Sequence, residues 1–165
     1  MTLSLSAKAY IAWARRFRGR ETVGVSEALA QPHRILVSLS HGGEDLKVLS
    51  VLRGRFPGSK FVLLMPEEKL WQIRDKVTGK VETITYSIQA RKLFGKEHRE
   101  LVRRLRVEAF DLGVTTEEGD VTLSDILLFR SGARLRVGKR REGSYPFLNC
   151  LVDSPEEFFA KELAG

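Results

Sequence analysis

Short apolar segments alternate with helix-length segments along most of this chain, and this alternation constrains the fold more than any other feature. Residues 34–39, 60–65 and 110–115 are apolar runs of strand length, and the first two are separated by a helix-length segment at 44–56 that ends before Pro57. Strands joined through helices of this length form parallel sheets that are covered on both faces. The sequence therefore predicts an α/β fold, a Rossmann-like three-layer sandwich with a mostly parallel sheet.

The same patterns predict the remaining elements. Residues 80–86 and 134–137 are expected as strands, and helices are expected at 66–77, 89–107, 120–131 and 155–163. Pro66 suits a first helical turn because proline needs no donor there, Gly95 is a candidate break in the long helix, and Ser154 is a candidate cap. We expect 34–39 to be the central strand, with 60–65 and 110–115 in the same sheet.

An additional helix precedes the alternating pattern. Its apolar face repeats at three- and four-residue steps and consists of Ala7, Tyr10, Ile11, Ala14 and Phe17. We expect this face to pack against protein, with contact to an anionic membrane surface as the alternative. The chain then divides into an N-terminal helix with its connection, 1–33, and a Rossmann-like domain, 34–165.

Charge and cysteine content limit the classes of partner. The chain has 28 Lys and Arg against 21 Asp and Glu, a net charge of +7, which favours phosphorylated sugars, nucleotides, nucleic acid or anionic lipid. The single Cys150 forms no intrachain disulfide, and no Cys and His spacing fits a zinc site. We expect no metal and a cytoplasmic protein, with peripheral contact at the inner face of the membrane as the alternative.

The turn after the first strand is the first candidate site. Ligands of open parallel sheets bind at the carboxyl ends of the strands, where two glycines let a ligand approach the backbone and helix amides can hold an anion. The candidate ligand-binding residues of this turn are Ser40, His41, Gly42 and Gly43. A tight turn without a ligand is equally open. The spacing fits neither G-x-G-x-x-G nor a P-loop, so no cofactor is expected.

Taken together, several segments resemble glycosyltransferase family 9, the ADP-heptose:lipopolysaccharide heptosyltransferases. Residues 34–65 combine a strand, a small-residue turn, a helix ending in the block Leu-x-x-x-Phe-Pro-Gly at 52–58, and a second apolar strand. The segments Phe-Asp-Leu-Gly-Val at 110–114 and Ser-Gly-Ala-Arg-Leu-Arg-Val-Gly at 131–138 continue the likeness. The resemblance spans about residues 34–163.

The resemblance implies the N-terminal, acceptor-binding half of a GT-B enzyme, whose nucleotide-sugar donor binds chiefly to a second half. We therefore expect no activity without a separate donor-binding half, and a separate chain or a homo-oligomer as partner. The family has Asp after the glycine as the proposed base for the acceptor hydroxyl, whereas this chain has Glu44, followed by Asp45. Glu44 is the candidate catalytic base, or simply an acid favoured at a helix N-terminus.

A basic run near the C-terminus is the second candidate site. Its candidate ligand-binding residues are Arg134, Arg136, Lys139, Arg140 and Arg141. The resemblance places part of this run on the acceptor side, where cations meet the phosphates of an anionic or phosphorylated glycan acceptor. A solvated basic face is the alternative. Tyr145 and Phe147 are the only rings close by, which disfavours nucleic acid. A non-catalytic binding or scaffold protein on the same fold is the alternative function.

Overall fold

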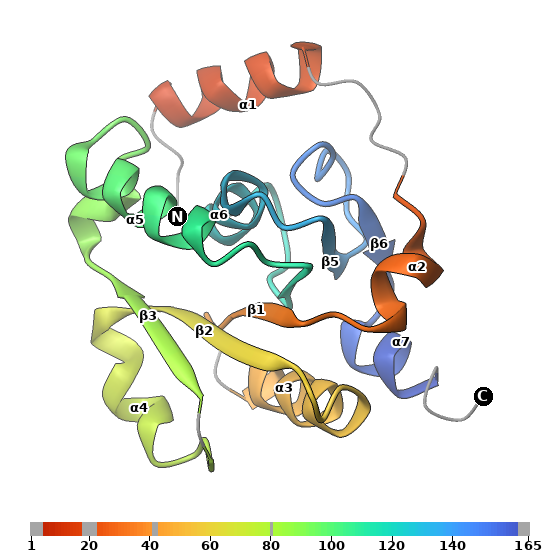
Figure 1. The fold of residues 1–165 in the computed structure, drawn as a ribbon. Helices are drawn as coiled ribbons and strands as arrows, with labels where there is room; N and C mark the ends of the chain where they lie inside the picture. The colour runs from red at the N-terminus through yellow and green to blue at the C-terminus, as the bar shows by residue number, and fades with distance from the viewer. Residues whose placement is uncertain (1–4, 18–22, 41–42, 80, 162–165) are drawn as a thin grey trace.

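A computed structural model describes residues 5–17, 23–40, 43–79 and 81–161 (Figure 1). Its strands form a six-stranded parallel sheet in the order β3-β2-β1-β4-β5-β6. The strands are β1 (Arg34–Ser38), β2 (Lys60–Pro66), β3 (Glu82–Tyr86), β4 (Leu112–Thr115), β5 (Leu135–Lys139) and β6 (Cys150–Val152). This is the strand order of doubly wound Rossmann sheets. The predicted α/β fold is confirmed, and β1 lies between β2 and β4 as expected.

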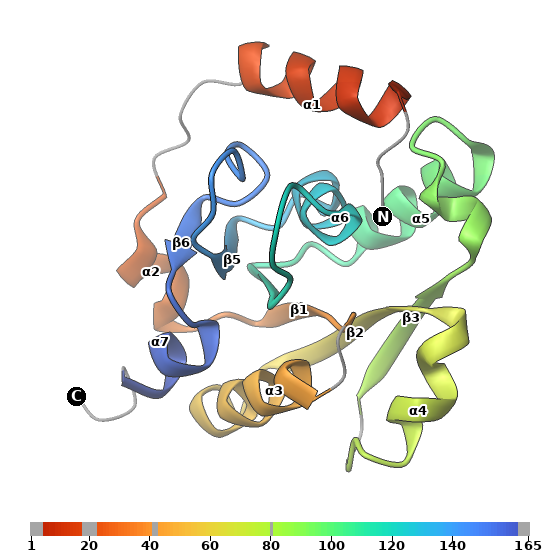
Figure 2. The ribbon, with the colours of Figure 1, turned by 180° about the vertical axis from the view of Figure 1, so that it is seen from behind.

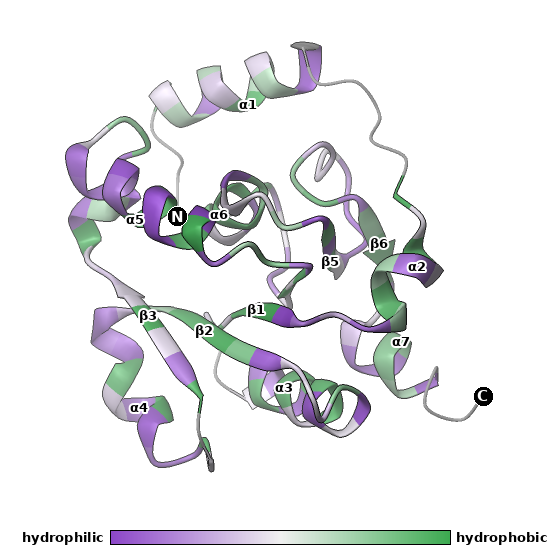
Figure 3. Cartoon of the chain, in the orientation of Figure 1, coloured by the Kyte–Doolittle hydropathy of each residue, from purple (hydrophilic) through white to green (hydrophobic). Residues whose placement is uncertain are grey.

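Helices cover both faces of the sheet (Figures 1 and 2). They are α1 (Leu5–Phe17), α2 (Val25–Ala30), α3 (Gly43–Arg55), η1 (Glu67–Lys69), α4 (Leu70–Arg74), η2 (Ile88–Arg91), α5 (Lys96–Val107), α6 (Leu123–Ser131) and α7 (Pro155–Lys161). Side chains alternate between the faces of a strand, so Ile35 and Val37 join the core beneath α3 and α7, whereas Leu36 joins the core beneath α5 and α6. Hydrophobic residues accordingly run along β1 and β2 (Figure 3).

The first helix, α1, lies outside the layer formed by α5 and α6 (Figure 1). Its buried residues Ala7, Ile11 and Ala14 share a hydrophobic cluster with Ile126 of α6 and with Phe147. The expected packing of this helix against protein is therefore confirmed for these residues. The side chain of Phe17, which the sequence places on the same face, lies outside the described residues. In the described part of the chain, no helix has the length and apolar character needed to cross a membrane.

Several boundaries differ from the sequence expectations. Pro66 does not begin a helix: it ends β2, where it pairs with Tyr86 of β3, and the helical segment after it ends at Arg74. The expected helix at 89–107 is broken at Gly95, the candidate break: η2 ends before this glycine and α5 begins after it. The expected cap of α7 is confirmed, since the backbone N–H of Glu157 donates to Ser154 Oγ at 3.3 Å. Residue 80 and residues 162–163 lie outside the described residues.

Two elements, α2 and β6, were not expected from the sequence. The helix α2 is only six residues long, and it places Ala28 and Leu29 in the core beneath α3. The strand β6 has three half-buried residues and extends the sheet beyond β5. Elements this short carry too few periods of an apolar pattern to be recognised.

Candidate functional site

The strand order creates a topological switch point at the carboxyl ends of β1 and β4. These two strands are neighbours, but the chain leaves β1 through α3 toward β2, and it leaves β4 through α6 toward β5. The two connections diverge to opposite faces of the sheet, and such a switch point is where open α/β sheets bind ligands. The start of α3 and the segment after β4 lie at this switch point.

A buried carboxylate joins the segments that follow β1 and β4. Asp45 is fully buried and accepts the backbone N–H of Ser40 at 2.7 Å, and it also accepts the hydroxyl of Thr116. Ser40 follows β1 and Thr116 follows β4, so Asp45 joins the ends of the two strands. Its carboxylate is therefore engaged within the protein, and it has a structural role.

The adjacent residue, Glu44, faces solvent instead. Its side chain is 62% exposed, and its Oε2 accepts a hydrogen bond from Lys139 Nζ at 3.1 Å. Lys139 ends β5 and also pairs with Glu118. The hydrogen bond to Glu118 raises the pKa of Lys139, burial opposes this effect, and the bond to Glu44 adds to it. The structure thus brings together two of the candidate site residues, Glu44 and Lys139, that are 95 positions apart in the sequence.

The other candidate residues of the turn are only partly described. The carbonyl of Ser40 accepts a hydrogen bond from Lys69 Nζ, which ties the turn to η1. Gly43 begins α3. His41 and Gly42 lie outside the described residues, so their expected role in ligand binding remains a prediction.

The basic run does not form one surface, because its members lie at different levels of the sheet. Arg140 is exposed at the carboxyl edge and pairs with Asp153 at 3.3 Å. Arg134 precedes β5 at the opposite edge, where it pairs with Glu27 at 3.0 Å. Of the basic candidates, Lys139 and Arg140 are the ones placed at the carboxyl edge with an exposed or half-buried side chain.

Arg136 and Arg141 are committed to contacts within the protein. Arg136 is 4% exposed, and its guanidinium donates to the carbonyls of Phe147, Ala133 and Pro146 at 2.7, 2.8 and 3.2 Å. Its donors hold the segment after β5, and the expectation that Arg136 binds a ligand stays a prediction. The guanidinium of Arg141 is likewise buried.

The partner of Arg141 is Asp125 in the first turn of α6. Burial raises the pKa of Asp125 to about 6, although the charge of Arg141 opposes this shift. Arg141 also donates to the carbonyl of Asp120 at 3.1 Å. The pair therefore fixes the segment after β5 to α6, and the expectation that Arg141 binds a ligand stays a prediction.

Sequence reasoning missed a chain of hydrogen-bonded hydroxyl groups at the switch point. Ser38 Oγ donates to Ser124 Oγ at 2.7 Å, and Ser124 Oγ donates to Glu117 Oε1 at 2.5 Å. Glu117 also affects a tyrosine at the end of β3. Burial is the main cause that raises the pKa of the Tyr86 hydroxyl, and the negative charge of Glu117 raises it further. The sequence signal that could have located this chain is the polar residue at the end of each strand. Only the order of the strands in the sheet shows which of these residues meet.

The sheet order defines a Rossmann-like α/β domain with a candidate site at its switch point. No family model matches the chain, and no curated protein matches it. Among solved structures, it is similar to a glycosyltransferase family 9 protein from Veillonella parvula DSM 2008, with a TM-score of 0.57 and 19% identity over 80% of this chain and 40% of that one. It is also similar to ADP-heptose lps heptosyltransferase II from E. coli, with a TM-score of 0.51 and 21% identity over 71% of this chain and 33% of that one.

At this level of identity the likeness shows the fold, which is the fold of the matched part of the glycosyltransferase family 9 structures. The chain spans less than half the length of either protein. The expectation of a heptosyltransferase-like fold, made from the motifs at 34–65, 110–114 and 131–138, is confirmed.

Proposed function

We propose that this domain is the acceptor-binding half of a heptosyltransferase-like glycosyltransferase in lipopolysaccharide or related glycan assembly. The donor nucleotide-sugar is bound by a second domain, and the described domain alone does not transfer sugar. The observation that carries this proposal is the position of Glu44, an exposed carboxylate at the switch point of a doubly wound sheet.

The switch point has the groups that such a reaction needs on its acceptor side. The Glu44 carboxylate takes the proton from the acceptor hydroxyl as that oxygen attacks the anomeric carbon of the donor sugar. The bond from this carbon to the diphosphate oxygen breaks, and the nucleoside diphosphate leaves on the second domain. Lys139 and Arg140 lie at the same edge and supply cations for the phosphates of an anionic glycan acceptor. Asp45 cannot replace Glu44 as the base, because its carboxylate is buried and already joins Ser40 to Thr116.

The ion pair between Glu44 and Lys139 favours a second candidate function. A carboxylate that is engaged by Lys139 must release this partner before it accepts a proton, and a domain that only binds the acceptor has no such need. A non-catalytic binding or scaffold protein on the same fold is therefore the alternative. The two functions differ in whether a donor-binding half restores transfer.

The test combines acceptor binding with transfer. Binding of a phosphorylated, lipid-A-linked sugar acceptor is measured by calorimetry for the chain and for Lys139→Gln, with Lys161→Gln as the control, since Lys161 also pairs with a glutamate but lies on α7. We expect about tenfold weaker binding for Lys139→Gln alone, which corresponds to ~1.4 kcal/mol. Equal binding by both variants contradicts the proposed acceptor site.

Transfer is then assayed with an ADP-heptose donor. The 165-residue chain is expected to be inactive alone and active when a donor-binding half is added in trans, and Glu44→Gln is expected to abolish the restored activity. Acceptor binding without restored transfer would support the scaffold function. Turnover by the chain alone would overturn the requirement for a second half, and its loss in Glu44→Gln would still identify the base.

A further inference from the structure

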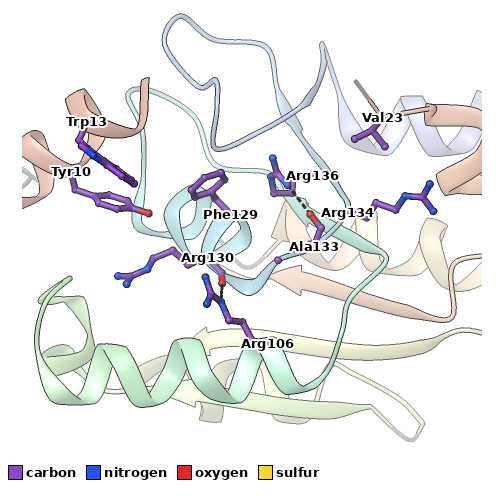
Figure 4. A pocket seen from close by; sticks show the side chains of 10 residues that line it. Tyr10, Trp13, Val23, Arg106, Phe129, Arg130, Ala133, Arg134 and Arg136 are labelled. Carbon is purple, nitrogen blue, oxygen red and sulfur yellow. Dashed lines mark hydrogen bonds between the residues drawn. The ribbon is translucent and has the colours of Figure 1, made fainter. Parts of the chain in front are cut away.

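A second pocket lies at the opposite edge of the sheet, between α1, the end of α5, the end of α6 and the start of β5 (Figure 4). Its volume is about 530 Å³, which is within the range of small-molecule sites. The lining includes Arg134, which precedes β5, whereas Lys139 and Glu44 lie at the far end of that strand. The pocket is therefore separate from the proposed acceptor site.

The pocket collects positive charge. Its four arginines are Arg106, Arg130, Arg134 and Arg136, and the described lining contains no acidic residue. Arg136 donates to carbonyl groups and Arg134 pairs with Glu27. The hydrogen bonds of the Arg106 and Arg130 side chains go to backbone carbonyls, so no carboxylate neutralises either charge in the described part of the chain. Because like charges repel, a bound anion would lower the electrostatic energy of this cluster of arginines.

Single hydrogen bonds hold Arg106 and Arg130 in position. Arg106 Nε donates to the carbonyl of Arg130 at 2.9 Å, and Arg130 Nη1 donates to the carbonyl of Leu93 at 3.0 Å. Within the described part of the chain, the terminal nitrogens of Arg106 have no hydrogen-bonding partner, and this side chain is exposed. Each guanidinium uses one nitrogen for these hydrogen bonds, and its other N–H groups can donate to the oxygen atoms of a phosphate.

An aromatic surface adjoins these arginines. The rings of Tyr10 and Trp13 stack with their centroids 5.8 Å apart at 26°, and the guanidinium of Arg130 lies over the Tyr10 ring at 5.5 Å. Trp13 is 47% exposed, although α1 buries its apolar face through other residues. An exposed indole beside arginines offers a flat surface on which a planar ring can stack.

We propose that this pocket binds a nucleotide, with its phosphates on Arg106 and Arg130 and its base against Trp13. The inference goes beyond the glycan-acceptor function, which uses the other edge of the sheet. The nucleotide can be a free nucleoside diphosphate or part of a single strand, because a neighbouring shallow pocket shares Arg106 and adds Arg99 and Arg103 of α5. Sequence reasoning missed the site because Tyr10 and Trp13 are more than ninety positions from Arg106 and Arg130.

Tryptophan fluorescence tests the proposal directly. The chain has two tryptophans, Trp13 and Trp71, and Trp71 is 73% exposed on α4, so Trp71→Phe leaves Trp13 as the only reporter. This variant is titrated with ADP, with inorganic pyrophosphate and with a short oligoadenylate at 150 mM salt. We expect ADP to quench Trp13 and to bind at least tenfold more tightly than pyrophosphate, because only ADP has a ring to stack.

Three variants locate the binding, measured by calorimetry with the ligand that binds more tightly. Arg106→Gln and Trp13→Ser are each expected to weaken it at least tenfold. Arg74→Gln removes the same charge from exposed α4 and is expected to leave it unchanged. Tighter binding of ADP than of oligoadenylate indicates a free nucleotide, and the reverse indicates a strand. The proposal is overturned by equal binding of ADP and pyrophosphate, by equal losses in Arg106→Gln and Arg74→Gln, or by no binding of any probe.

Discussion

At the scale of single residues, Glu44 and Asp45 show how neighbours acquire different roles. Successive side chains leave a helix about 100° apart, so at the start of α3 one carboxylate faces solvent while the next faces the sheet. Asp45 accepts hydrogen bonds from residues that follow β1 and β4, whereas Glu44 lies at the surface beside Lys139. The position of each carboxylate in the helical turn thus determines which of the two is exposed.

Substitution of the two acids is expected to separate stability from function. Asp45→Ala leaves the Ser40 N–H and the Thr116 hydroxyl without their acceptor in a buried place, which costs roughly 1–3 kcal/mol for each unsatisfied group. Glu44→Gln, at an exposed position, is expected to change the free energy of unfolding by less than about 0.5 kcal/mol. Urea unfolding followed by circular dichroism measures both. Equal destabilisation by the two substitutions would contradict the assignment of Asp45 as the structural carboxylate.

A buried histidine makes the stability depend on pH. His98 is fully buried in α5, and its Nδ1 lies 2.7 Å from the carbonyl of Ala90. Burial lowers the pKa of His98, the charge of Arg130 lowers it further, and the contact with Ala90 opposes both effects. The unfolded chain therefore binds a proton on this side chain more readily than the folded protein does. Its contribution to stability is complete above about pH 6.5 and decreases as the pH falls through the ordinary histidine pKa.

Replacement of His98 by glutamine is expected to remove this dependence. Glutamine keeps a donor for the Ala90 carbonyl but does not titrate, so the free energy of unfolding of His98→Gln should fall less steeply than that of the parent between pH 7.5 and 5. Asp125 contributes in the opposite direction, because its raised pKa of about 6 makes the folded state bind its proton more readily. Both proteins contain Asp125, so the difference between their profiles isolates His98. Parallel profiles would show that His98 does not titrate differently in the two states.

At the scale of elements, sequence patterns predicted the strands and helices that are long and have a regular apolar pattern. The strands β1, β2 and β4 and the helix α3 were expected because each combines an apolar run with a clear boundary, such as Pro57 after α3. Pro66 was misread because its missing N–H suits a strand end as well as a first helical turn. The site was predicted only in part, because the meeting of Glu44 with Lys139 and of Ser38 with Ser124 requires the order of the strands. Periodicity does not contain that order.

Close contact between α6 and the sheet depends on a glycine in β4. A Cβ atom added to Gly113 would lie 2.8 Å from Leu128 Cδ2 and 3.3 Å from the Cβ of Ala133, and both neighbours are fully buried. Gly113→Ala is therefore expected to destabilise the fold by roughly 1–3 kcal/mol through overpacking. In Gly54→Ala, within α3, the added Cβ has no atom within 4 Å, and the gain in helix propensity should stabilise by up to about 1 kcal/mol. Opposite shifts of the melting temperature are the expected result, and a neutral Gly113→Ala would show that α6 can move away.

At the scale of the whole molecule, the two edges of the sheet carry different chemistry. The carboxyl edge combines Glu44 with Lys139 at the switch point, whereas the amino edge collects arginines and the rings of α1. The net charge of +7 did not distinguish these surfaces, because the basic run at 134–141 divides between both edges and the interior. The helix α1 contributes to the amino edge in two ways: Tyr10 and Trp13 line the pocket, and the apolar face of the helix packs against α6.

The docking of α1 predicts that it unfolds together with the rest of the molecule. Ile11 is 7% exposed in the cluster with Ile126 and Phe147, so Ile11→Ala is expected to lower the free energy of unfolding by roughly 2 kcal/mol or more. Leu5, on the same helix but 85% exposed, is the matched control, and Leu5→Ala should change stability by less than about 0.5 kcal/mol. Urea unfolding measures stability, and co-sedimentation with anionic liposomes at 150 mM salt measures membrane contact. If the helix instead serves a membrane, Ile11→Ala will reduce liposome binding and leave the unfolding curve unchanged. We expect the reverse, because the apolar face that a bilayer would bind is already buried against α6.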